Sequence, residues 1–113
     1  MRFEWGSIPK SVTSDPSVGV TTLVVAPGVG QQIWITDIAF YATISGVPDY
    51  ATTASLNNGV ADKYMCWHGL VANLQAPIPL GDNLPMVIVV YNTGTPTLAL
   101  VNVGYYIEGS DHY

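Results

Sequence analysis

Charged side chains are scarce in this chain. Asp, Glu, Lys and Arg make up 10% of its 113 residues, against about 25% in an ordinary soluble domain. Eight acids outnumber three bases and give a net charge of −5, and no charged residue lies between Asp15 and Asp37 or between Asn83 and Ile107. Nucleic-acid binding needs clustered Lys and Arg to displace phosphate counterions. The sequence therefore predicts no nucleic-acid partner.

Cysteine and long apolar runs are equally limited. The single cysteine, Cys66, excludes an intrachain disulfide and argues against an oxidising compartment. The longest strictly apolar run, Met86–Tyr91, is far shorter than the roughly 20 residues that cross a bilayer. Gly, Ser and Pro follow Met1–Trp5, where a signal peptide would have an apolar run. We therefore expect synthesis in the cytoplasm, with no signal peptide and no membrane partner.

Apolar residues, by contrast, are plentiful. They make up 49% of the sequence, and the length suits one domain with a core of its own. A small domain has a high surface-to-volume ratio, so a chain this apolar and this poor in charge is expected to bury one face against neighbours. The alternative is a monomer whose surface is solvated by Thr, Ser, Asn and Gly.

Most of the chain is predicted to be β-strand. Runs rich in β-branched and aromatic residues alternate with clusters of Gly, Pro and Asn, and no segment favours a long helix. Strands are predicted at Val18–Ala26, Gln32–Ile44, Thr52–Leu56, Lys63–His68, Leu70–Ala76, Leu84–Tyr91 and Leu98–Ile107. Seven or eight antiparallel strands predict an all-β fold, a β-sandwich of jelly-roll type. An immunoglobulin-like sandwich is less favoured, because its Cys–Trp–Cys spacing is absent.

These strands define one domain over residues 18–108. An irregular, extended N-terminal arm at 1–17 precedes it, because Pro9 and Pro16 interrupt any regular element. A short C-terminal tail follows at 109–113. The arm combines aromatic and basic side chains that we expect to dock on a neighbouring chain: Arg2, Phe3, Trp5 and Lys10.

Two predicted strands have apolar residues on both sides. In the strand at 32–44, one alternating set is Trp34, Ile38, Phe40 and Ala42, and the other is Ile33, Ile35, Ala39 and Tyr41. This pattern predicts a strand that is covered on both faces. In the strand at 84–91, one set is Met86, Ile88 and Val90. That set forms either part of the core or a trimer interface, and the sequence leaves both open.

Residues that could carry chemistry are few. Cys66 and His68 share a face of a predicted strand, but a zinc site needs three or four ligands, and a nucleophilic cysteine needs a base and an orienting group. We expect Cys66 in the core and His68 at a polar rim. A glycosidase requires two acids that face one cleft, and nothing in the sequence pairs the acids in this way. Their spacing does not indicate a calcium site either. The acids considered are Asp37, Asp49, Asp62, Asp82 and Glu108. The sequence predicts no enzyme, no metal site and no cofactor.

Aromatic residues leave a second class of function open. Three tryptophans and seven tyrosines could provide a sugar-stacking platform on a β-sandwich. Trp34 and Trp67 lie in predicted strands, where burial in a core or an interface is the commoner outcome. A carbohydrate-binding module is therefore the alternative to an assembly protein.

Several stretches of the chain follow a known pattern. Thr22–Ile33 contains Ala-Pro-Gly-Val-Gly between two predicted strands, and Thr36–Ile38 continues the second of them. Near the end, Leu84–Tyr91 is followed by Val101–Glu108. Together these stretches resemble the opening and closing hairpins of small jelly-roll decoration (cement) proteins of tailed bacteriophage capsids.

This resemblance implies a structural virion protein. Such proteins are commonly homotrimers that lie on the capsid surface where subunits of the major capsid protein meet, and they stabilise the head. Gln31 and Gln32 follow the Gly-x-Gly, where Arg or Lys often stands in that family. The alternative is a carbohydrate-binding or receptor-binding β-sandwich module of a phage fibre.

Overall fold

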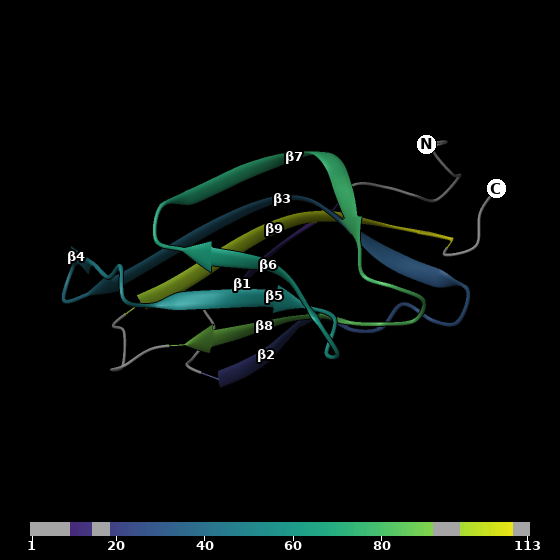
Figure 1. Cartoon of the computed structure of the whole chain (residues 1–113), viewed down its shortest axis with the longest axis horizontal. Coiled ribbons are helices and arrows are strands. Elements are labelled where there is room, and N and C mark those ends of the chain that lie inside the picture. Colours follow the sequence, from purple (N-terminus) through teal and green to yellow (C-terminus); the bar gives the residue numbers. More distant parts are fainter. Residues whose placement is uncertain (1–9, 15–18, 92–97, 110–113) are drawn as a thin grey trace.

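Nine β-strands, and no helix, make up the part of the chain that the structure describes (Figure 1). The computed structural model describes residues 10–14, 19–91 and 98–109. In chain order, the strands are β1 (Lys10–Ser14), β2 (Gly19–Val24), β3 (Gln31–Ile44), β4 (Val47–Pro48), β5 (Thr53–Asn57), β6 (Asp62–Trp67), β7 (Leu70–Pro79), β8 (Met86–Tyr91) and β9 (Leu98–Gly109).

The strands form two antiparallel sheets packed face to face (Figure 1). Sheet A has the order β1-β9-β3, and both β7 and the two-residue β4 pair with the far side of β3. Sheet B has the order β2-β8-β5-β6. Apart from the β5–β6 hairpin and the short β4, each successive strand changes sheet. This connectivity is that of a jelly roll and confirms the predicted fold class.

The core lies between the two sheets and consists of the inward-pointing residues of each sheet. Leu56 and Ile88, for example, are paired neighbours on β5 and β8 of sheet B, and both are fully buried. Complete burial of one such side chain stabilises the fold by about 1.5–3 kcal/mol. The buried cluster comprises Ile33, Ile35, Ile38, Phe40, Ala42, Ala54, Leu56, Cys66, Leu70, Leu80, Met86, Ile88, Val90, Ala99, Val101 and Val103.

A β-bulge in β3 corrects the predicted faces of that strand. The register against β9 shifts between Ile35 and Asp37, so that Thr36 is the additional residue. Before the bulge the inward residues are Ile33 and Ile35, and after it they are Ile38, Phe40 and Ala42. Strict alternation along the sequence assigned these two groups of residues to opposite faces. The bulge adds one residue, which reverses the alternation and brings both groups to the same face. Only one face of β3 therefore packs in the core between the two sheets, and the cover expected on its other face stays a prediction.

Gly104 provides the space that this bulge needs. It lies opposite Asp37 in the β3–β9 ladder, and the Asp37 carboxylate lies over its backbone. A Cβ atom at this position would be 1.9 Å from Asp37 Oδ1 and 2.9 Å from Thr36 Oγ1. The Thr36 hydroxyl donates a 2.8 Å hydrogen bond to Asp37 Oδ1. The close approach of this carboxylate explains why β9 has a glycine in the middle of a strand.

Most strand boundaries lie within two residues of the predicted ones, and the larger differences are two additional strands and a longer β7. β1 lies within the segment 1–17 that we expected to be irregular, and it forms an edge strand against β9. The β-branched pair Val12 and Thr13 in this segment favours a strand, but the prolines on either side were given more weight in the sequence analysis. β4 lies in the predicted loop after Ile44, β7 extends to Pro79, and Gly109 belongs to β9 rather than to the tail.

Candidate interaction surfaces

The described residues bring no reactive groups together. No cluster of three or more His, Cys, Asp or Glu side chains that could hold a metal occurs among them. Cys66 is fully buried in the core, as predicted, and burial raises the pKa of its thiol to about 12. The thiol is therefore protonated at neutral pH. His68 is only partly buried and lies at the rim of sheet A, where its Nδ1 accepts a 3.1 Å hydrogen bond from the Ala42 N–H.

Most of the carboxylates on the predicted strand ends and loops have structural partners. Asp49 is buried and accepts hydrogen bonds from the Ala51 N–H and the Thr52 hydroxyl. Asp82 accepts a 2.7 Å hydrogen bond from the Gly30 N–H. These contacts join loops to their neighbours, which is the ordinary role of Asp at turns.

The outer face of sheet B has exposed apolar side chains on β2, β8 and β6, with Ser55 and Thr53 of β5 between them. Because side chains alternate along a strand, the residues that flank the buried set of β8 point outward, and the β2–β8–β5–β6 register aligns them in rows. One row contains Val20, Val89, Ser55 and Met65, and a second contains Tyr91, Thr53 and Trp67. Val20, Met65, Trp67 and Tyr91 are all exposed. We call this surface the sheet B face.

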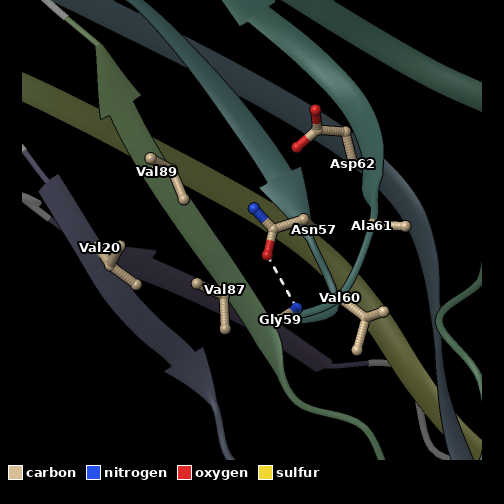
Figure 2. A pocket seen from close by; sticks show the side chains of 8 residues that line it. All are labelled: Val20, Asn57, Gly59, Val60, Ala61, Asp62, Val87 and Val89. Carbon is tan, nitrogen blue, oxygen red and sulfur yellow. Dashed lines mark hydrogen bonds between the residues drawn. The ribbon is translucent and has the colours of Figure 1, made fainter.

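A groove of about 220 Å³ lies at one end of the sheet B face. Figure 2 shows the side chains of Val20, Val87 and Val89 on one side of β2 and β8, with the β5–β6 turn beside them. The Asn57 side-chain Oδ1 accepts a 2.8 Å hydrogen bond from the Gly59 N–H within this turn. Asp62 stands at the rim and accepts a hydrogen bond from the Ser55 hydroxyl. The complete lining is Val20, Asn57, Gly59, Val60, Ala61, Asp62, Val87 and Val89.

Aromatic rings gather near the end of the molecule that contains β4. Tyr91 and Trp67 flank Thr53 on the sheet B face, and both rings are about half exposed. On sheet A, the His68 ring lies 4.9 Å from the Tyr41 ring and 5.1 Å from the Tyr50 ring, centroid to centroid. Exposed rings of this kind suit either protein contacts or sugar stacking.

The outer face of sheet A combines apolar and polar residues. A second groove, of about 230 Å³, is lined by Tyr41, Val71 and Leu100 among other residues. Towards the opposite end of the sheet, Trp34 and Tyr106 lie side by side with their rings nearly parallel, at an interplanar angle of 7° and a centroid separation of 6.1 Å. Glu108 follows on the same face and is only 2% exposed.

The predicted interface residues fall into two groups, a set on β8 that the structure places and a set in the N-terminal segment that lies outside the described residues. Met86, Ile88 and Val90 are at most 2% exposed within a single chain, so this face of β8 belongs to the core and not to a trimer interface. Arg2, Phe3 and Trp5 lie outside the described residues. The backbone of Lys10 lies in β1, opposite Tyr105.

Sequence reasoning missed the outward residues that form the sheet B face. The signal was present in β8, because Val87, Val89 and Tyr91 alternate with the core set. Choosing between the two sets required the second sheet, which places one of them inside. For Val20, Met65 and Trp67, the cross-strand register was needed to show that they share one surface.

Comparison with known proteins assigns the chain to no family. No family model and no curated protein matches the chain. One similar solved structure belongs to Bacillus endospore appendages, described as forming a novel family of disulfide-linked pili. Its TM-score is 0.45 at 15% identity, over 88% of this chain and 86% of that chain, and so distant a likeness says nothing about function. Within the described residues, no helix could cross a membrane.

Proposed function

We propose that this chain is a structural assembly protein whose copies associate through the sheet B face. The observation that carries the proposal is the nature of that face, where exposed Val20, Met65, Trp67 and Tyr91 extend across three of the four strands. Soluble monomers rarely expose apolar surface that continues across several strands, and such surface marks a site of association. Because charged residues are so few, the same face of a second copy complements this face better than a charged surface does.

In its specific form, the proposal is a homotrimer on the surface of a phage capsid. The jelly-roll fold, which recurs in viral capsid domains, and the resemblance to decoration proteins support this form. A trimer that bridges subunits of the major capsid protein binds the assembled shell and not its dissociated subunits. Binding therefore shifts the equilibrium towards the intact particle. At roughly 25 cal/mol per Å² of buried apolar area, a modest contact contributes several kcal/mol before association costs.

The mass of the protein in solution tests the association. Light scattering coupled to size exclusion is expected to give three times the 12.1 kDa of one chain. A single 12.1 kDa species at high protein concentration contradicts the proposal. Sedimentation of the protein together with assembled heads, compared with heads that lack it, then tests the capsid partner.

A carbohydrate-binding or receptor-binding module of a fibre is the second candidate. The observation in its favour is the pair of exposed rings, Tyr91 and Trp67, on either side of Thr53. Two strand spacings separate their backbones by about 10 Å, a span that suits stacking against two sugar rings of one chain. A glycan array distinguishes this candidate from the first. Binding that is lost in Trp67→Ala supports it, and the absence of any glycan binding removes it.

A further inference from the structure

The turn between β5 and β6 contains the one Asn-Gly pair in the sequence, Asn58 and Gly59. Asn-Gly is the pair in which a backbone nitrogen most readily attacks the preceding side-chain amide, because glycine has no Cβ atom to block the approach. The turn requires this glycine, since its φ of 87° lies in the left-handed region that other residues rarely adopt. The hairpin therefore places an intrinsically reactive asparagine at a fixed position.

The side chain of Asn58 links this hairpin to the opposite sheet. Its Nδ2 donates a 2.7 Å hydrogen bond to the Leu80 carbonyl oxygen, just after β7. The Leu80 N–H in turn donates a 2.9 Å hydrogen bond to the carbonyl oxygen of Ile33 in β3. Asn58 is only 5% exposed. The amide thus connects the β5–β6 hairpin of sheet B, through one residue, to a central strand of sheet A.

Both groups that would react with each other are bound in the folded hairpin. Asn58 Oδ1 accepts hydrogen bonds from the Val60 N–H at 2.9 Å and from the Ala61 N–H at 2.8 Å. Two donors at the oxygen and one acceptor at the nitrogen allow a single orientation of the amide. The nucleophile is the Gly59 nitrogen, and its N–H donates a 2.8 Å hydrogen bond to Asn57 Oδ1 (Figure 2). Attack therefore requires that several hydrogen bonds of the turn break first.

We propose that Asn58 is a deamidation site, which the hydrogen bonds of the folded hairpin hold unreactive and which reacts when the hairpin opens. In this reaction the Gly59 nitrogen loses its proton and bonds to Asn58 Cγ, the Cγ–Nδ2 bond breaks, and ammonia leaves. Water then opens the resulting succinimide at one of its two carbonyl carbons and leaves an aspartate or an isoaspartate.

The product does not fit the site that the asparagine leaves. Neither aspartate nor isoaspartate has the N–H group that the Leu80 carbonyl oxygen accepts, and a new carboxylate is placed where water is excluded. The modified hairpin closes less firmly than the original one, so the modification records which chains have opened. This inference does not depend on the proposed association.

Peptide mapping by mass spectrometry tests the reactivity in the full chain. The folded protein and the protein unfolded in urea are incubated at the same mildly alkaline pH and temperature. In urea, Asn58 is expected to deamidate faster than the other asparagines, since none of them precedes a glycine. In the folded protein its rate is expected to be at least about tenfold lower, because reaction then requires local opening of the hairpin. Equal rates in the two states, or faster reaction of another asparagine in urea, overturn the proposal.

The hydrogen bond that holds the nucleophile can be removed separately. Asn57→Ala takes away the oxygen that binds the Gly59 N–H and is expected to raise the deamidation rate of Asn58 in the folded protein severalfold. Asn57→Ser is the matched control, because a serine hydroxyl also accepts a hydrogen bond from the N–H two residues further on. Its rate is expected to stay closer to that of the parent chain. No acceleration in Asn57→Ala, or equal acceleration in both variants, refutes protection by these hydrogen bonds.

Thermal melts test the consequence for the fold. Asn58→Asp replaces the Nδ2 donor by an oxygen and is expected to lower Tm by about 4 °C or more, because a buried hydrogen bond is lost. Asn83→Asp is the matched control. The side chain of Asn83 is bound through its Oδ1, which accepts a 3.0 Å hydrogen bond from the Gly28 N–H and which an aspartate retains, so Tm is expected to be nearly unchanged. If Asn58→Asp melts with the parent chain, the product fits the closed hairpin and the proposal is wrong.

Discussion

The outer faces of the two sheets differ in what they expose, although both sheets are antiparallel. Sheet A exposes the charged Asp37 and the polar Asn102 at outward positions of β3 and β9. The outward rows of sheet B consist mostly of apolar, aromatic and hydroxyl side chains, with Asn57 and Asp62 at the β5–β6 turn. A face with so little charge is only weakly kept apart from a similar face by repulsion or hydration. The proposed association therefore uses the outer face of sheet B rather than that of sheet A.

A matched pair of substitutions tests this difference and has the largest expected effect. Val20 and Val71 are both highly exposed, at 73% and 80%, and lie on the edge strands β2 and β7 of sheets B and A. Val20→Glu places a like charge on each copy at the proposed interface, which costs several kcal/mol. It is expected to convert the oligomer to a monomer in light scattering. Val71→Glu is expected to leave the mass unchanged, and equal effects of the two variants abolish the distinction between the faces.

The two sides of β8 give the next contrast. Ile88 is fully buried between the sheets, and truncation to Ala leaves a cavity that costs about 2–5 kcal/mol. Val89 is its neighbour on the sheet B face and is partly exposed. Val89→Ala is expected to cost less than Ile88→Ala in denaturant unfolding and to weaken association instead. If Ile88→Ala leaves the unfolding midpoint unchanged, the assignment of Met86, Ile88 and Val90 to the core is wrong.

The bulge in sheet A has no counterpart at the centre of sheet B, and Gly104→Ala tests it. The added methyl collides with the Asp37 carboxylate, so the substitution is expected to destabilise the fold by about 1–3 kcal/mol. Removing the carboxylate relieves the collision. Asp37→Ala combined with Gly104→Ala is therefore expected to be more stable than Gly104→Ala alone in thermal melts. Failure of this rescue shows that the glycine is needed for its backbone and not for the space above it.

This bulge also marks the limit of what the sequence predicted. β-Branched and aromatic runs with turn residues between them placed seven strands close to their observed positions, because those signals are local. The inward faces of β8 and β9 follow simple alternation, as Val101 and Val103 show. In β3 the alternation reverses at Thr36, and only the partner strand reveals this.

The sheet B face was even harder to predict from the sequence, because it is defined by long-range strand pairing. Val20 and Met65 are far apart in the sequence and meet in one row only through the ladders of β8 and β5. Sequence patterns show that a residue alternates with a core position, but not which residues of other strands lie beside it.

The stability of the fold at alkaline pH depends on one buried ionisable group in each sheet, Cys66 in sheet B and Tyr106 in sheet A. Burial raises the pKa of Cys66 in sheet B from 9.0 to about 12 and also raises that of Tyr106 in sheet A. The unfolded chain therefore loses these protons first, so the stability they confer is complete below about pH 9 and decreases as the pH rises towards 12. Each group lowers the free energy of unfolding by at most about 1.4 kcal/mol per pH unit. Urea unfolding between pH 8 and 11 measures this slope. Cys66→Ala is expected to reduce the slope from pH 9 upward and Tyr106→Phe only above about pH 10, whatever either variant does to stability at neutral pH. Slopes identical to that of the parent chain in both variants refute the linkage.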